Sequence, residues 1–166
     1  YCWGVNTYGQ LGVSTISVSS TQYSLTPILV PGISSVTMIT QGGQNNCAIS
    51  ASAVYCWGSN SFGNGADGTK TGTQQTPAAR TLLTSDVLAI ASTNYATCAI
   101  KNYSLYCFGS NNNYGLGVGM DMPIGGSFFS GAAPITGAMA SGVNGVFGSK
   151  AITRICVTKS DGSLHC

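Results

Sequence analysis

Three stretches of the chain are near copies of one another: YCWGVNTYGQLG at residues 1–12, YCWGSNSFGNG at 55–65 and YCFGSNNNYGLG at 106–117. A shorter LHC at 164–166 occupies the place of a fourth start. The cysteines of these starts, Cys2, Cys56, Cys107 and Cys166, recur at intervals of 54, 51 and 59 residues. Intervals of this size are typical of the blades of a β-propeller, so the chain is predicted to be a tandem repeat.

Each repeat also has a second shared half. It ends in CAIS (47–50), CAIK (98–101) and CVTK (156–159), after stretches rich in Val and Ile such as VTMI (36–39) and VLAI (87–90). This pattern predicts two strands joined by a hairpin. A proline recurs 20, 21 and 22 residues before the second cysteine, as Pro27, Pro77 and Pro134. Length varies mainly between the first half and this proline, where we expect surface loops.

The order of these elements resembles the regulator-of-chromosome-condensation repeat family in a secreted, disulfide-bearing form, similar to a β-lactamase-inhibitor protein of that propeller fold. The first repeat fits best; the second lacks the Leu that follows Gln10, and the third has Phe108 in place of Trp. The resemblance implies an all-β fold of three four-stranded antiparallel blades, part of a seven-bladed ring. We expect one propeller segment, residues 1–166, with repeats at about 1–54, 55–105 and 106–166. Because three blades do not close a ring, we expect it to be a fragment of a longer chain.

Six of the seven cysteines fall into pairs at nearly constant separation: Cys47 with Cys56, Cys98 with Cys107, and Cys156 with Cys166. Opposed residues of a β-hairpin lie within disulfide reach, so three disulfides are predicted. Cys2 is left unpaired in this segment, with its partner expected nine residues upstream. Metal binding is disfavoured, because the spacing lacks the close cysteine pairs of zinc sites and His165 is the only imidazole. We expect no metal and no cofactor.

The composition limits the compartment and the partners. Charged residues make up 6% of the chain, and there is no Glu, so either glycans or contacts with other chains must cover the surface. The net charge of +2 comes from scattered Lys and Arg, which excludes a nucleic-acid partner. No apolar run reaches the roughly 18 residues of a membrane helix. Lasting disulfides need an oxidising compartment, which indicates an extracellular or cell-surface location and disfavours a nucleotide-exchange or chromatin role.

Each candidate for chemistry has a structural alternative. His165 aligns with the tyrosine that precedes each repeat cysteine, and neighbouring Asp161 with its Gly162 predicts a hairpin turn, so no Ser-His-Asp triad and no enzyme is expected. Two further sets recur with the repeat. One is a set of aromatic residues, which could form a sugar-binding ladder, although its period favours packing between blades. The other is a set of asparagines, which we expect to hold turns. The two sets are Trp3, Trp57 and Phe108, and Asn6, Asn60 and Asn111.

These observations predict a non-enzymatic extracellular module, structural or interacting, of a larger cell-surface or fibre-forming glycoprotein. The alternative is a soluble secreted propeller that binds another protein across its face. Asn102-Tyr103-Ser104 is an expected N-glycosylation acceptor in a turn. The partners of the module would be other protein chains or further blades of the same protein, and glycans. The loops 13–26, 66–76 and 118–133 would carry recognition, with these anchors: Tyr23, Met120, Met122, Phe128 and Phe129.

Overall fold

The structure, a computed structural model, describes residues 1–166 except 71, 81–82, 112–115, 117–127, 136 and 150–153, and for 128–134 and 138 it describes the backbone alone. The described residues form antiparallel strands and one short 3₁₀ helix, η2 (Gly137–Met139). The strands are β1 (Cys2–Val5), β2 (Tyr23–Ile28), β3 (Val36–Gln41), β4 (Asn45–Ser50), β5 (Ala53–Ser59), β6 (Thr73–Ala79), β7 (Val87–Ser92), β8 (Ala96–Lys101), β9 (Ser104–Ser110), β10 (Phe128–Pro134), β11 (Val143–Gly148), β12 (Ile155–Lys159) and β13 (Leu164–His165).

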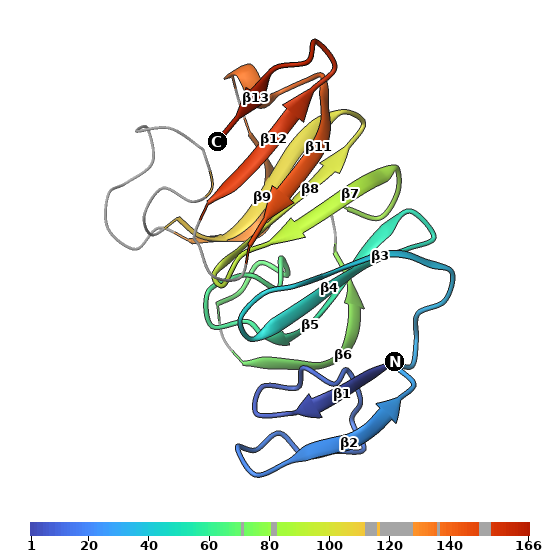
Figure 1. The fold of residues 1–166 in the computed structure, drawn as a ribbon. Coiled ribbons are helices and arrows are strands. Elements are labelled where there is room, and N and C mark those ends of the chain that lie inside the picture. The colour runs from blue at the N-terminus through green and yellow to red at the C-terminus, as the bar shows by residue number, and fades with distance from the viewer. Residues whose placement is uncertain (71, 81–82, 112–115, 117–127, 136, 150–153) are drawn as a thin grey trace.

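The strands group into sheets that follow one another along the molecule. Two of them are four-stranded, β3-β4-β5-β6 and β7-β8-β9-β10. The two-stranded sheet β1-β2 precedes them and the three-stranded sheet β11-β12-β13 follows. Figure 1 shows this succession from β1 and β2 at the foot of the view to β13 at its top. The predicted all-β fold of propeller blades is confirmed.

A repeat counted from Tyr1 starts on the third strand of a sheet. β1, β5 and β9 carry the aromatic-Cys-aromatic-Gly motif, and each is followed by the outer strand of its own sheet before the next sheet begins. The three repeats therefore give two complete four-stranded sheets and two partial ones. The motif alone could not reveal this offset, because it marks a strand and not a sheet boundary.

The recurrent glycine and proline have positions that the strand pattern explains. The glycine of the motif lies at a β-bulge, with φ of 99° at Gly4, 102° at Gly58 and 110° at Gly109, a region that favours glycine. Pro27 and Pro77 lie in β2 and β6, the outer strands of their sheets. An edge strand tolerates proline because one side of it needs no hydrogen-bond donor.

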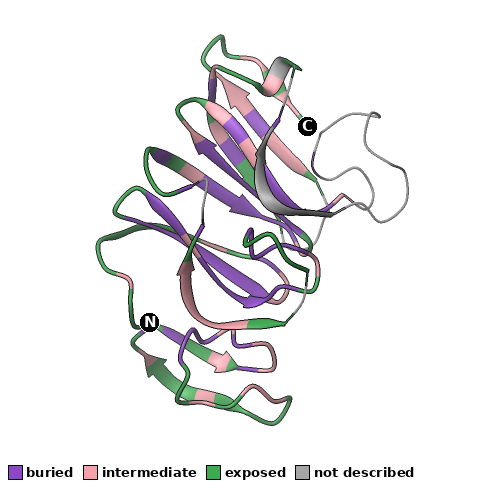
Figure 2. Cartoon of the chain, turned by 180° about the vertical axis from the view of Figure 1, so that it is seen from behind, coloured by how far each residue is buried: buried purple, intermediate pink, exposed green. Residues whose placement is uncertain are grey.

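The hydrophobic core lies between successive sheets. One cluster joins the first and second sheets through Leu11, Val30 and Trp57, and the next joins the second and third through residues such as Ile49 and Phe108. A third cluster continues to the last sheet. Figure 2 shows buried residues concentrated in the two complete sheets, whereas β1 and β2 are largely exposed. Each sheet is thus stabilised by its neighbours.

Candidate interaction surface

The three predicted cysteine pairs are disulfides in the structure. β4 and β5 place Cys47 directly opposite Cys56, with their Cα atoms 4.1 Å apart. β8 and β9 place Cys98 opposite Cys107 in the same register, and Cys156 is joined to Cys166 beside β13. Each bond links neighbouring segments of one sheet, so it restrains that sheet.

Cys2 is the one free cysteine among the described residues, and it is buried. It occupies the place on β1 that Cys56 occupies on β5. Burial raises the pKa of the Cys2 thiol, although the nearby N-terminal ammonium group acts in the opposite direction. A raised pKa lowers the fraction of thiolate, which is the nucleophilic form, at a given pH.

The aromatic residues of the motif have two different environments. Trp57 is 1% exposed and Phe108 is fully buried between sheets, as blade packing predicts. The Trp57 indole also donates a hydrogen bond to the Gln10 carbonyl, 2.9 Å away. Trp3 is 64% exposed, because no described residues pack against its face of the first sheet. The set therefore does not form a sugar-binding ladder.

The recurrent asparagines hold the turns that follow the motif strands. The Oδ1 atoms of Asn6, Asn60 and Asn111 accept hydrogen bonds from the backbone N–H five residues later, at 3.0, 2.8 and 3.1 Å. Asn6 also donates to the Ile16 carbonyl at 3.0 Å. Asn60 donates instead to the Asp67 carboxylate at 2.9 Å. These side chains are structural, as the sequence predicts.

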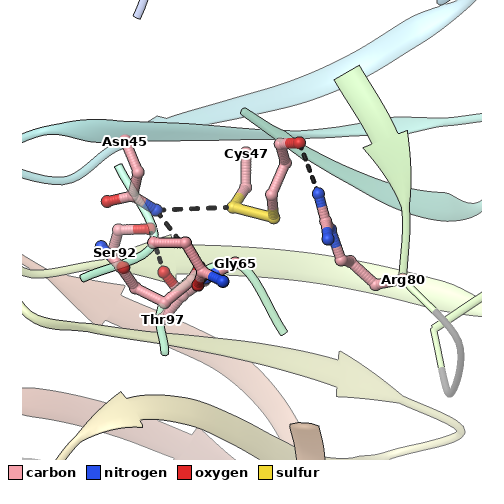
Figure 3. Close-up of a disulfide and its surroundings, with 9 residues drawn as sticks. Asn45, Cys47, Gly65, Arg80, Ser92 and Thr97 are labelled. Atoms are coloured by element: carbon pink, nitrogen blue, oxygen red, sulfur yellow. Dashed lines mark hydrogen bonds between the residues drawn. A yellow bond between two sulfur atoms is a disulfide. The ribbon is translucent and has the colours of Figure 1, made fainter. Parts of the chain in front are cut away.

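A buried arginine is the main polar feature that the sequence analysis missed. Arg80 is 2% exposed and donates from Nη2 to the Cys56 carbonyl at 2.6 Å, beside the Cys47–Cys56 disulfide (Figure 3). Desolvation lowers the pKa of Arg80 to about 10, and the Asp67 carboxylate opposes that shift. Counted from the recurrent proline, Arg80 takes the place of Val30, which is the one sequence signal that marks it as buried.

Asp67 is held by its loop. Burial raises its pKa, but hydrogen bonds from the Thr69 backbone and side chain and from Asn60, together with Arg80, outweigh that effect and leave the pKa lowered. Both Thr69 bonds are 2.8 Å long. This cluster fixes the loop after β5.

The histidine near the C-terminus does not have the hydrogen bonds of a catalytic triad. Ser163 Oγ donates to Asp161 at 2.6 Å, and His165 Nε2 lies 3.0 Å from the same hydroxyl. The single hydroxyl proton is given to the carboxylate, so the imidazole must donate to Ser163 and does not act as its base. The pKa of Asp161 is lowered by the side-chain and backbone hydrogen bonds from Ser163. This arrangement fits a hairpin turn.

The remaining predicted positions lie on the surface or outside the described residues. Asn102 is exposed in the turn between β8 and β9, with a φ of 49° that asparagine tolerates well. Tyr23 is exposed at the start of β2. Met120 and Met122 lie outside the described residues, and the backbone of Phe128 and Phe129 forms the start of β10.

The first sheet presents an apolar surface. Several of its residues are more than half exposed: Tyr1, Trp3, Val5, Tyr23, Leu25 and Leu29. Exposed apolar residues that gather in this way mark an interaction surface more often than isolated ones do. Within the described ranges, no three His, Cys, Asp or Glu residues gather as metal ligands. No helix in that part of the chain is long and apolar enough to cross a membrane.

Comparisons with known proteins agree with this fold. The family model of the regulator of chromosome condensation (RCC1) repeat matches residues 1–49. No curated protein sequence matches the chain.

Solved structures match over most of the chain. Prp20p from Saccharomyces cerevisiae, described with its binding properties to Gsp1p and histones, has a TM-score of 0.74 at 17% identity, over 89% of this chain and 37% of that one. Yeast RCC1 (Prp20) bound to Kap60 has a TM-score of 0.72 at 18% sequence identity, over 87% of this chain and 35% of that one. Human WBSCR16 has a TM-score of 0.66 at 18% sequence identity, over 89% of this chain and 37% of that one. The chain thus spans little more than a third of each of these propellers.

Proposed function

We propose that this chain is a non-enzymatic, extracellular interaction module of a larger cell-surface or fibre-forming glycoprotein. The observation that carries the proposal is the set of three disulfides, one in each of three successive sheets. Disulfides of this kind persist in oxidising compartments and are rare in the cytosol and nucleus. The module would be the secreted form of the repeat, acting through its surfaces.

The size of the relatives supports a larger ring. The solved propellers are nearly three times as long as the part that this chain covers. We propose that residues 1–166 supply three repeats, at about 1–54, 55–105 and 106–166, to a seven-bladed ring. The exposed apolar side chains of the first sheet would then face a further blade or another chain.

Protein partners are the class that the surface fits best. Prp20p is described as binding Gsp1p and histones, and yeast RCC1 was solved with Kap60 bound. We extend to this chain only the use of a propeller surface to bind protein. A nucleic-acid partner is not part of the proposal, because 6% charged residues and a net charge of +2 offer no basic surface.

A secreted, soluble, inhibitor-like binder is the second candidate. Recognition would lie in the loops 13–26, 66–76 and 118–133, and the exposed Tyr23 within the first of these favours it. Aromatic side chains that become buried on binding often dominate interface energies. The two candidates differ in whether the partner is a permanent part of the assembly or a separate soluble protein.

The compartment is tested on protein isolated from its source. Thiols are blocked with an alkylating reagent before lysis, and intact mass is measured with and without reduction. We expect six cysteines to be protected and the protein to be found outside the cell or on its surface. Recovery of the native protein with these six cysteines alkylated, inside the cell, would refute the proposal.

Glycosylation is tested at Asn102. We expect a peptide N-glycosidase to lower the mass of the native protein and to leave Asn102→Asp, made in the same host, unchanged. Aspartate is the matched replacement because it also tolerates the positive φ of this turn. An unglycosylated Asn102 in the native protein would remove glycans at this site from the proposal.

Partner binding is tested with matched surface variants. Proteins cross-linked to the native protein are identified, purified and titrated against the chain by calorimetry. We expect Tyr23→Ser to weaken a 1:1 complex at least tenfold, whereas Leu88→Ser, an equally exposed apolar position on β7, leaves it unchanged. Equal effects of both changes would contradict a recognition role for Tyr23.

A further inference from the structure

A groove lies between the first and second sheets, beside β1. It encloses a cavity of about 340 Å³, and its lining includes Cys2, Val36, Ile39, Ala48 and Trp57. Among the described residues, β1 pairs with β2 alone, so its other edge has no strand. The groove therefore combines an open strand edge, an apolar wall and a thiol.

The same positions are covered wherever a complete sheet lies next to them. Val36 and Ile39 of β3 are 45% and 51% exposed. The register pairs Ile39 with Ala48, Ile90 with Ala99 and Val146 with Val157, so these positions are equivalent. The counterparts on β7 are buried, with Val87 5% and Ile90 4% exposed. The counterparts on β11 are buried as well, with Val143 0% and Val146 8% exposed. The groove is thus an inter-sheet core that lacks part of its contents.

The next interface along the chain shows what is missing. Val87 and Ile90 are buried in one cluster with Cys47 and Ile49 of β4 and with Val54 and Cys56 of β5. At the groove, Cys2 takes the place of Cys56, and no described residue takes the place of Cys47 or Ile49. A strand with a cysteine followed two residues later by a branched aliphatic side chain would complete the same cluster here.

The bulge glycine of β1 gives an independent indication. A Cβ atom added to Gly58 would lie 2.5 Å from the Gln44 carbonyl and 2.8 Å from the Asn45 Cα, where the chain enters β4. The Ser59 N–H bonds to the same carbonyl at 2.8 Å. A Cβ atom added to Gly4 would meet none of the described atoms within 4 Å. The equivalent Gly109 also lies against backbone, at the Tyr95 carbonyl and the Ala96 Cα, so among the described bulge glycines of the motif Gly4 is the one without such a neighbour.

We propose that a strand of the β4 type, from a further repeat of the same polypeptide, fills this groove, pairs antiparallel with β1 and forms a disulfide with Cys2. Its sequence would follow the order Cys-x-aliphatic of Cys47 and Ile49. A strand like β12 fits this order less well, because two residues after Cys156 it has Thr158 where β4 has an isoleucine. The strand pairing goes beyond the proposed function, while the disulfide needs the oxidising compartment that this function assumes.

The disulfide forms by thiol–disulfide exchange with a small-molecule disulfide such as glutathione disulfide. The Cys2 thiolate attacks one sulfur and releases one reduced glutathione. The thiolate of the incoming cysteine then attacks the Cys2 sulfur of the mixed disulfide and releases the second. Two thiols are oxidised to one cystine, one glutathione disulfide is reduced to two thiols, and the two protons end on the released glutathiones.

A fusion tests the proposal directly. A copy of residues 36–54 is placed immediately before Tyr1, which puts the copied cysteine nine residues ahead of Cys2 and supplies strands equivalent to β3 and β4. After refolding in a glutathione redox buffer, peptide mapping should show Cys2 joined to the copied cysteine. Amide exchange in residues 2–5 should slow at least tenfold, and the Tm should rise by about 5–10 °C.

Two control fusions separate strand pairing from the disulfide. Changing the copied cysteine to Ser should keep the slow exchange in β1 and lose the disulfide. Changing the copy of Ile49 to Asp should abolish both, because a carboxylate would enter an apolar core. The proposal is overturned if exchange in β1 is the same with and without the fusion, or if Cys2 instead links two chains. Because the buffer supplies the oxidant, such a failure would leave the proposed function standing.

Discussion

Replacing Gly58 with alanine should destabilise the protein far more than the same change at Gly4. Both glycines occupy the bulge of a motif strand, with φ of 102° and 99°. The strain of placing an L-residue there is therefore the same at both sites, about 1–3 kcal/mol. They differ in what the new methyl group meets.

At Gly58 the methyl group would lie 2.5 Å from the Gln44 carbonyl. Either the strand moves and the hydrogen bond from Ser59 is lost, at about 1 kcal/mol, or the overpacking remains, at about 1–3 kcal/mol. The expected loss is about 4 kcal/mol for Gly58→Ala, against about 2 kcal/mol for Gly4→Ala, where the methyl group meets none of the described atoms.

Urea unfolding of the two oxidised variants and the parent chain, followed by tryptophan fluorescence, measures this difference as a change in midpoint at constant m-value. Equal losses at the two sites would refute the reasoning, because backbone strain alone would then account for both. A neutral Gly58→Ala would also refute it, since the methyl group would then fit between β5 and β4.

Three further predictions follow from the side chains. Trp57→Ala should cost about 3–5 kcal/mol in thermal unfolding, whereas Trp3→Ala at its exposed site should stay within about 0.5 kcal/mol; equal effects would contradict inter-sheet packing. Asn60→Ala should cost about 1–3 kcal/mol, because the buried Gly65 N–H loses its acceptor. Asn60→Asp should cost at least as much, because the new carboxylate would face the Asp67 carboxylate, to which the Asn60 amide donates. The pKa of Asp67 is lowered on folding, so its contribution is present above the unfolded value near 3.8 and is lost as pH falls through the folded value. Asp67→Asn should therefore flatten the loss of melting temperature below that pH, and an unchanged acid limb would contradict this.

Features that depend on short stretches of sequence could be predicted. The cysteine pairing follows from the hairpin register, which places Cys47 opposite Cys56 within nine residues. The role of Asn60 follows in the same way, because its bond to the Gly65 N–H spans five residues. The all-β fold follows from the repeat period and the Val- and Ile-rich strands.

Features that depend on the neighbouring sheet could not be predicted from the sequence. The sequence treats Trp3 and Trp57 as equivalent, yet one is exposed and the other buried, because burial depends on which sheet packs against that face. Arg80 is one of the scattered Lys and Arg residues of the sequence, and nothing in its immediate neighbours predicts that it lies in the interior. Its position could be inferred only by aligning it with Val30, and its hydrogen bond to Cys56 crosses 24 residues.

The prolines of the outer strands bear on how so weakly charged a chain stays dispersed. An outer strand is where a foreign strand would dock, and most proteins discourage this with lysine or glutamate. This chain has 6% charged residues and no Glu, but Pro27 and Pro77 each remove an N–H from an outer strand. An intruding strand would find an interrupted row of donors there, so backbone chemistry would guard against edge-to-edge aggregation where charge repulsion is scarce.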